Sequence, residues 1–228
     1  MSKYKPYYGN EFDWDEKYHF DDFWNFNLIV SVKKYLYETF HGKPNLNFLE
    51  IGCYQGMTTI WILENILTHE TSKIHCVDLF SNDDYSELYP NSHLGKNVHQ
   101  KNYEQHFLKN IELSELSHKV TIHKGPSYRE LKSEEIKENS FDAILIDGSH
   151  TAYDTLLDAA MSHHLLKSGG FMFFDDYHWK PDEFHWGTDT RPQTSPELGI
   201  NSFVENFGIF YDVLEKDDTL PIVTLKKL

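Results

Sequence analysis

The chain has little of several things that would define its class, and each shortage excludes something. Only two cysteines, Cys53 and Cys76, occur in its 228 residues. They form no CxxC or Cys/His metal pattern, so we expect two reduced thiols rather than a disulfide framework. Apolar runs are short too, and none approaches the roughly 18 residues that a membrane-spanning helix requires.

Positive charge is also scarce. The chain has 21 Lys and Arg against 36 Asp and Glu, a formal net charge of −15. Nucleic acids and anionic membranes are both bound by basic surfaces, so we expect neither kind of partner. The first twenty residues lack the apolar segment of a secretory signal, so we expect a cytoplasmic protein.

What the chain does contain is an alternation of strand-like and helix-like segments, typical of one α/β domain. Amphipathic stretches predict helices over about 57–68, 103–116, 153–166 and 197–207, and Gly169-Gly170 is expected to cap the third of them. No helix separates the last two predicted strands, which indicates a C-terminal antiparallel hairpin beside a mostly parallel seven-stranded sheet with helices on both faces. The predicted strands are 46–51, 73–79, 119–124, 141–147, 171–174, 210–214 and 222–226.

The N-terminal region differs from the rest. Its first 24 residues carry nine aromatic side chains without a clear period, and a helix is predicted over about 21–41, ended by Gly42 and Pro44. We therefore divide the chain into an N-terminal arm and helix, 1–45, and a main domain, 46–228. Either the arm packs on the domain, or it forms a lid or an oligomer contact over the ligand site, which makes a homodimer plausible.

The most informative segment is NFLEIGCYQG, residues 47–56. A buried strand ends here and turns through Gly52 and Gly56 into a helix. Glycines at such a turn let the backbone approach a nucleotide-like ligand that a Cβ atom would keep away. Dinucleotide oxidoreductases have a similar turn, but the spacing here is G-x-x-x-G and not the G-x-G-x-x-G that a pyrophosphate requires.

The other predicted strands of the parallel sheet also end in polar or glycine-rich segments. Asp78 ends the second strand, where a carboxylate can accept hydrogen bonds from both hydroxyls of a ribose. Gly125-Pro126-Ser127 follows the third, Asp147 to His150 the fourth, and Asp175-Asp176-Tyr177 the fifth. The carboxyl ends of parallel strands lie at one edge of a sheet, so we expect one ligand site there.

Three acids in this set, Asp147, Asp175 and Asp176, end adjacent strands and should converge. Unless a cation neutralises them, at least one of the three must have a raised pKa. Their oxygen atoms suit Mg²⁺, which leaves positions open for substrate oxygens. The alternative is that one acid touches a cofactor while the others cap turns. His150 has two possible roles as well, a general base or a hydrogen bond at a helix entry.

Three segments resemble class I S-adenosylmethionine-dependent methyltransferases of the "methyltransferase 24" type, a group related to the sugar O-methyltransferases of macrolide and aminocoumarin pathways. They are LEIGCYQGMTTIWILENIL, KGPSYREL and IDGSHTAYDTLLDAAMSHHLLKSGGFMFFDDY, and the resemblance covers about residues 46–228. It implies a Rossmann-like methyltransferase fold.

The resemblance also implies site residues. The backbone of 52–56 would line the methionine part of S-adenosylmethionine, Thr58 would hold its carboxylate, Asp78 its ribose, and Ser127 would border its adenine. In the sugar O-methyltransferases, acids matching Asp147, Asp175 and Asp176 hold Mg²⁺, which orients a substrate diol and lowers a hydroxyl pKa. The full set expected at the cofactor is Glu50, Gly52, Cys53, Tyr54, Gly56, Thr58, Asp78, Ser127 and Asp147.

The expected function is therefore methyl transfer from S-adenosylmethionine to a hydroxyl of a small molecule, a sugar or glycosylated metabolite, assisted by Mg²⁺. His150 and Asp147 are the candidate catalytic residues. Two alternatives stay open, namely metal-independent methylation of a nitrogen or carboxylate, and a catalytically inactive subunit that only binds cofactor.

Overall fold

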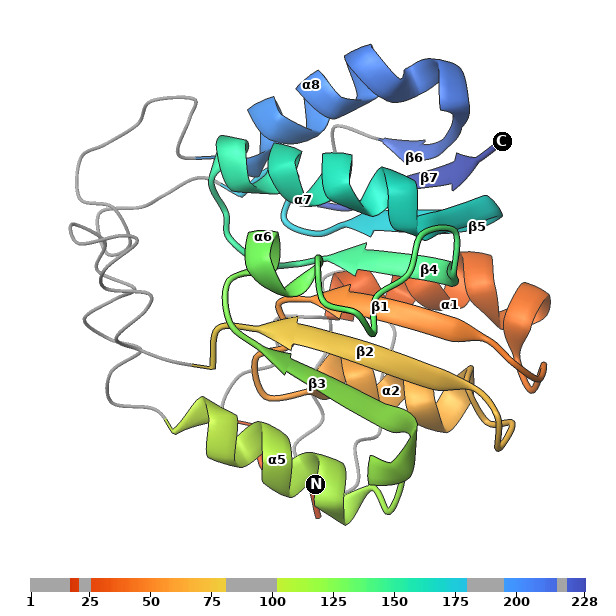
Figure 1. Cartoon of the computed structure of the whole chain (residues 1–228), viewed down its shortest axis with the longest axis vertical. Coiled ribbons are helices and arrows are strands. Elements are labelled where there is room, and N and C mark those ends of the chain that lie inside the picture. The colour runs from red at the N-terminus through yellow and green to blue at the C-terminus, as the bar shows by residue number, and fades with distance from the viewer. Residues whose placement is uncertain (1–16, 21–25, 81–101, 180–194, 217–220) are drawn as a thin grey trace.

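A computed structural model of the chain describes residues 17–20, 26–80, 102–179, 195–216 and 221–228. They form one seven-stranded sheet with the order β3-β2-β1-β4-β5-β7-β6 (Figure 1). β1 to β5 are parallel, and β7 pairs antiparallel with both β5 and β6. The expected Rossmann-like methyltransferase fold with its terminal hairpin is confirmed. The strands are β1 Asn47–Ile51, β2 Lys73–Asp78, β3 Val120–Lys124, β4 Phe141–Ile146, β5 Leu166–Phe174, β6 Tyr211–Lys216 and β7 Val223–Lys227.

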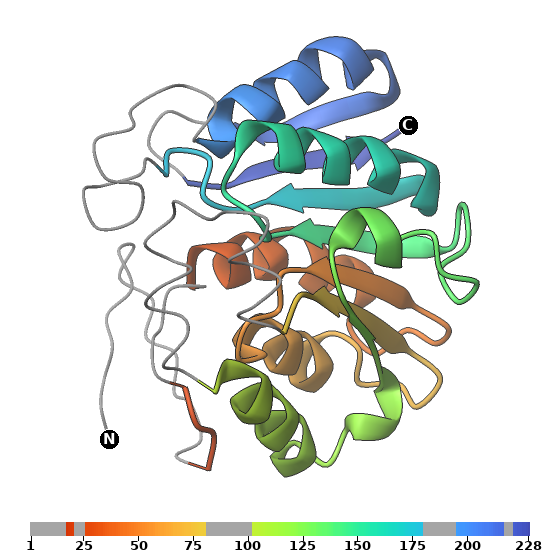
Figure 2. The same cartoon turned by 60° about the vertical axis from the view of Figure 1, so that its left-hand side comes forward.

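Helices cover both faces of the sheet (Figures 1 and 2). One face carries α1 (Phe26–Phe40), α2 (Met57–Asn65) and α5 (Tyr103–Leu113), and the other carries α7 (Ala152–Leu165) and α8 (Pro196–Phe207). Short helical segments complete the chain: η2 Ser117–Lys119, α6 Ser127–Glu130 and η4 Gly208–Phe210.

The central strands are apolar on both sides because both of their faces are buried. In β1, Phe48 packs toward α1 and α2, whereas its neighbour Leu49 packs toward α7. The same alternation runs through β5, where Phe173 lies in the first core and Phe174 in the second. Successive side chains of a strand point to opposite faces, so these strands read as continuous apolar runs rather than alternating ones.

One sequence prediction is wrong in a way that has a clear cause. Gly169 and Gly170 do not cap the helix before them, because β5 begins at Leu166, directly after α7. Leu166 already pairs with Phe141 of β4. The helix end is capped from a distant part of the chain, since the Lys227 ammonium donates to the backbone oxygens of His163 (2.6 Å) and Leu166 (2.7 Å). A lysine at this position satisfies carbonyls that have no partner within the helix.

Most of the N-terminal arm lies outside the described residues. The hypothesis that the arm forms a lid or an oligomer contact concerns those residues and stays a prediction. The described part packs on the domain. Tyr18 is buried and its hydroxyl donates to Glu64 Oε1 of α2 at 2.5 Å. Asn110 of α5 bonds both backbone groups of His19, at 2.7 and 3.0 Å.

Within the described residues, no helix is both long and apolar enough to cross a membrane. The two cysteines are free thiols, and both are buried.

Candidate active site

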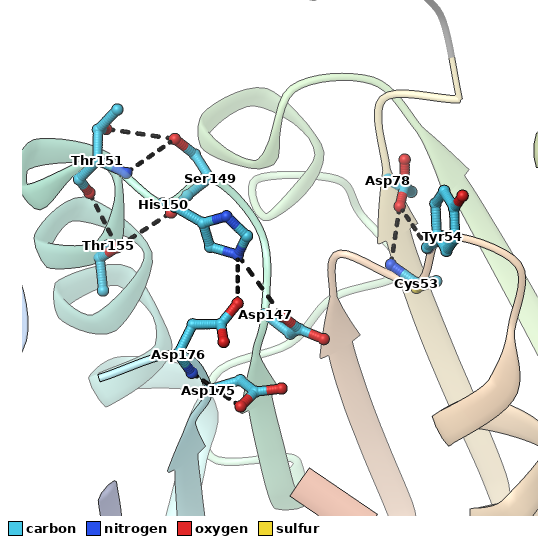
Figure 3. Close-up of polar contacts among 10 residues, drawn as sticks. All are labelled: Cys53, Tyr54, Asp78, Asp147, Ser149, His150, Thr151, Thr155, Asp175 and Asp176. Carbon is cyan, nitrogen blue, oxygen red and sulfur yellow. Dashed lines mark hydrogen bonds and ion pairs between the residues drawn. The ribbon is translucent and has the colours of Figure 1, made fainter. Parts of the chain in front are cut away.

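The polar strand ends meet at the carboxyl edge of the parallel strands, as the sequence predicts. The strand order reverses between β1 and β4, and this is the position at which open α/β sheets bind ligands. The glycine turn and Asp78 lie on the β1–β2 side of the reversal, whereas the acids lie on the β4–β5 side (Figure 3). The site therefore has two halves, which we call the turn half (Gly52 to Gly56 with Asp78) and the acid half (Asp147, His150, Asp175 and Asp176).

The two glycines of the turn are required by contacts inside the protein. Gly52 has φ +86°, and a Cβ there would lie 1.9 Å from the backbone oxygen of Asp147. Gly56 has φ +83°, and its Cβ would lie 3.0 Å from the ring of Phe107. Gly52 thus allows the end of β1 to pass against the end of β4. The spacing predicts the turn correctly. At Gly52, however, the contact with the Asp147 backbone already requires glycine, whether or not a ligand binds.

Asp78 acts as a clamp on this turn. Its Oδ2 accepts hydrogen bonds from the backbone N–H groups of Cys53 (2.8 Å) and Tyr54 (2.9 Å) (Figure 3). Its Oδ1 accepts from the backbone N–H of Phe80 (3.0 Å). Burial raises the pKa of Asp78, and these three bonds oppose that rise. The clamp holds Tyr54 at φ +47°, a conformation that is costly for a residue with a Cβ. Asp78 therefore has a structural role in the turn, and its ribose role stays a prediction.

Glu50 lies beneath the turn and is fully buried. Thr59 of α2 donates a short hydrogen bond to Glu50 Oε2, and Oε1 has no hydrogen-bond partner among the described residues. Burial raises the pKa of Glu50 to about 8, so the side chain is neutral at pH 7. A neutral acid explains how a carboxyl group can lie between β1 and α2 without a cation.

Thr58, like Glu50, is more deeply buried than its expected contact with the cofactor requires. It occupies the first turn of α2 but is only 1% exposed, and its hydroxyl has no hydrogen-bond partner among the described residues. A ligand carboxylate would reach this hydroxyl only after the turn opened. The backbone of the turn is therefore the better placed ligand surface.

Ser127 has a partner that the sequence does not suggest. Its hydroxyl donates to Asp158 Oδ1 of α7 at 2.5 Å. Asp158 is 2% exposed, and burial raises its pKa to about 7 although the bond from Ser127 lowers it. The strand-end pattern does not point to Asp158, because this residue lies in mid-helix, remote in sequence from every strand end. The only sequence signal is an acid among apolar residues of an otherwise buried helix face.

The acid half brings His150 among the carboxylates (Figure 3). His150 Nε2 lies 3.0 Å from Asp176 Oδ2 and 4.0 Å from Asp147 Oδ1. The shorter contact lacks the angle of a hydrogen bond, so it is an ion pair rather than an aligned bond. Asp175 is directed differently, because its Oδ1 accepts from the backbone N–H of Asp176 at 2.8 Å. The set whose ligand atoms lie within 4.8 Å of one another is Asp147, His150 and Asp176.

Charge in this half is distributed unevenly. Burial raises the pKa of Asp147 to about 6, and burial together with the charge of Asp147 holds the pKa of Asp175 well above its usual range. Burial alone would lower the pKa of His150, but its contacts with Asp147 and Asp176 outweigh that effect and raise it to about 10. His150 is therefore an imidazolium that balances the acids. The sequence-based expectation of at least one raised carboxyl pKa agrees with this arrangement.

Two further features position the acid half. Asp176 has φ +58°, a left-handed conformation that Asp tolerates better than most residues. The Trp179 ring lies 4.7 Å from the His150 ring, between centroids. The helix entry after His150 is capped by Thr151, whose hydroxyl accepts from the Asp154 N–H, so His150 itself is not the cap.

The donors fit a divalent cation. Asp147 and Asp176 present carboxylate oxygens within 4.8 Å of each other, together with one imidazole nitrogen. Asp175 adjoins the same pair through its charge interaction with Asp147. Carboxylate oxygens are the ligands that suit Mg²⁺, whereas His150 as an imidazolium has no lone pair with which to bind a cation.

Several solved structures have the same fold as this chain, although their sequences are less than 20% identical to it. An O-methyltransferase from Bacillus cereus in complex with SAH is 17% identical, with 88% of this chain and 80% of that chain covered and a TM-score of 0.55. SAH-bound methyltransferase PaMTH1 from Podospora anserina is 16% identical, with 88% and 76% covered and a TM-score of 0.56. The O-methyltransferase NovP is 14% identical, with 88% and 79% covered and a TM-score of 0.61.

A comparison with curated protein sequences found no match. A family model does match, over residues 49–177, a range that begins in β1, contains the glycine turn and ends just after Asp175 and Asp176. On this match, the chain belongs to the Methyltransf_24 family of methyltransferase domains.

Proposed function

We propose that the protein transfers a methyl group from S-adenosylmethionine to a hydroxyl of a small molecule, with a sugar or glycosylated metabolite as the acceptor. The observation that carries the proposal is the pairing of the two halves across the β1–β4 reversal. A clamped glycine turn on one side suits a nucleoside donor, and a cluster of three acids and a histidine on the other suits activation of a hydroxyl.

The turn half supports the donor. Its backbone is held by Asp78, whose Oδ1 keeps one lone pair free for a ribose hydroxyl after accepting from Phe80. Residues Gly52 to Gly56 would line the methionine part, with Cys53 and Tyr54 contributing backbone rather than side chain. Two of the solved structures with this fold contain SAH, the product that the donor leaves behind.

The acid half supports the acceptor. A sulfonium is already a good leaving group, so the enzyme has to align the nucleophile with the methyl carbon and remove the proton of the hydroxyl. Asp147, at the end of β4, lies between the turn half and Asp176 (Figure 3). The acceptor hydroxyl has to be placed in this position to face the methyl group of the donor. Two of the solved structures are O-methyltransferases, which agrees with oxygen as the acceptor atom.

A divalent cation, Mg²⁺ in the first instance, would be held by Asp147, Asp176 and Asp175. When bound it supplies Lewis-acid chemistry, which lowers the pKa of a coordinated hydroxyl. The chain's own contribution is to hold the carboxylates together, through the left-handed backbone of Asp176 and its N–H bond to Asp175.

His150 would take the hydroxyl proton. As an imidazolium paired with Asp176 it has no free lone pair at Nε2, so it is not a base in that state. Neutralising the Asp176 charge removes the attraction that raises the His150 pKa, and the neutral ring then becomes a competent base near pH 7. His150 would therefore act as a base only when a bound cation neutralises the charge of Asp176.

The first experiment is calorimetry with S-adenosylhomocysteine, for which we expect micromolar binding. A protein that binds none at high micromolar ligand would not be an S-adenosylmethionine enzyme. With a glycosylated acceptor panel, EDTA should abolish turnover and added Mg²⁺ or Mn²⁺ should restore it. Turnover that resists EDTA would instead favour the metal-independent alternative.

A further inference from the structure

Asp158 is a buried acid that the proposed reaction does not use. It lies on α7 and its carboxylate reaches two different strand ends. Oδ1 accepts the hydroxyl proton of Ser127, which follows β3, at 2.5 Å. Oδ2 lies 3.6 Å from the position that a Cβ on Gly148, which follows β4, would occupy. A side chain that is 2% exposed thus bonds the segment expected at the adenine and lies beside the segment that carries His150.

The direction of the Ser127 bond has a chemical consequence. A serine hydroxyl has one proton and two lone pairs. Since the hydroxyl directs its one proton to Asp158, Ser127 can only accept a hydrogen bond from a ligand. A serine without this partner could turn its hydroxyl and either donate or accept.

Ser127 lies where a nucleoside base would be. The end of β3 is tied to the end of β2, because the Gly125 N–H donates to the backbone oxygen of Asp78 at 2.9 Å. A base attached to a ribose at Asp78 would extend along this edge to the start of α6, where Ser127 is partly exposed. This placement rests on the proposed function.

We propose that Asp158 is a positioning residue that makes the Ser127 hydroxyl an obligate acceptor and so selects a purine that presents an amino group. In a 9-substituted adenine the 6-amino group carries the only N–H donors. A 6-oxo purine has an oxygen at that position, and its lone pairs would face those of Ser127.

The test compares the binding of S-adenosylhomocysteine and S-inosylhomocysteine by calorimetry, at about pH 8, where the Asp158 carboxylate is ionised. We expect the wild-type protein to prefer the adenosyl ligand by about tenfold, the effect of one hydrogen bond against one unpaired acceptor. Ser127→Ala and Asp158→Ala should each remove most of that preference. The double variant should lose no more than either single variant, because both act through one hydroxyl.

Asp158→Asn is the conservative variant, since its amide oxygen can still accept from Ser127, and it should keep the preference. Asp154→Asn is the matched control. Asp154 lies one turn earlier on α7 and burial also raises its pKa to about 7, but it accepts from Thr151 at 2.8 Å and not from Ser127.

The outcomes separate cleanly. If Asp158→Ala or Ser127→Ala keeps the wild-type preference, or if their effects add, the inference is wrong while the proposed function stands. A wild-type protein that binds S-adenosylhomocysteine without any preference overturns it too. Absence of binding to both ligands contradicts the proposed function itself. Ser127→Ala and Asp158→Asn keep the test decisive if Asp158→Ala does not fold, because neither creates a cavity in the core.

Discussion

The two halves of the site satisfy their polar groups in opposite ways. In the turn half, Asp78 is met by three backbone N–H groups, at 2.8, 2.9 and 3.0 Å. In the acid half, Asp147 and Asp176 both face the His150 side chain, at 4.0 and 3.0 Å. The bonds to Asp78 depend on backbone geometry, whereas the pairing of the acids depends on the proton that gives His150 its charge.

This difference indicates how the halves should respond to ligands. Backbone donors cannot be titrated or moved without rebuilding the chain, so the turn half is organised before the donor binds. A histidine whose charge is stabilised by neighbouring carboxylates changes its protonation when the neighbouring charge changes. We therefore expect the turn half to determine cofactor affinity and the acid half to determine the rate of the chemical step.

The largest effect expected on the acid half is that of Asp176→Ala. Removing this carboxylate takes away one oxygen of the proposed cation site and the main partner of His150, so turnover should fall by about 10³-fold, within the range for groups that act in proton transfer. Affinity for S-adenosylhomocysteine should change by less than about twofold. Steady-state kinetics and calorimetry on the same preparation check both. An equal loss of binding and turnover would mean that the halves are not separate.

Gly52→Ala tests the turn half as a packed structure. The new Cβ would lie 1.9 Å from a backbone oxygen, so the ends of β1 and β4 must separate, at a cost of about 3 kcal/mol or more in the free energy of unfolding. Gly169→Ala is the matched control, because Gly169 has φ +77° but nothing within 4 Å of its Cβ position. It should cost only about 1 kcal/mol, from backbone conformation alone. Denaturant unfolding measures both, and similar losses would refute the steric explanation.

Asp78→Ala tests the clamp. Without the carboxylate, the N–H groups of Cys53 and Tyr54 lose their acceptor and the ribose loses its own, so S-adenosylhomocysteine should bind about 100-fold more weakly. Asp78→Asn keeps one acceptor oxygen, so its affinity for S-adenosylhomocysteine should lie between those of the wild-type protein and Asp78→Ala. Calorimetry measures the affinities. An Asp78→Ala protein with unchanged affinity would show that neither the clamp nor the ribose contact matters.

Glu50→Gln should change the pH dependence of stability, with the smallest effect of the four. The folded-state pKa of about 8 lies above the unfolded value near 4.5, so between these values only the unfolded chain has released its proton. The stabilisation from Glu50 is thus fully present below about pH 4.5 and is lost as the pH rises toward 8. Between about pH 6.5 and 8 the unfolding free energy should fall by about 2 kcal/mol more in the wild-type protein than in Glu50→Gln. Parallel curves for the two proteins in chemical denaturation would contradict the raised pKa.

Much of the site could be anticipated because it depends on local pattern. The turn at Gly52 and Gly56 and the acids at Asp78, Asp147 and Asp176 all follow apolar strands, and parallel strands place such ends together. Asp158 and Lys227 could not be anticipated in this way. Each acts on a segment that is remote in the sequence, on Ser127 from the middle of α7 and on the end of α7 from β7.

By itself, then, the sequence determined the order of strands and helices, the edge of the sheet that carries the polar residues, and the family, because these follow from periodicity and from motifs of neighbouring residues. Only the tertiary structure decided that Gly52 must be glycine to pass Asp147, that His150 is a cation between Asp147 and Asp176, and that the Ser127 hydroxyl donates its hydrogen bond to Asp158. These properties depend on distances of a few ångströms between residues far apart in the chain, and on the burial that changes their pKa values.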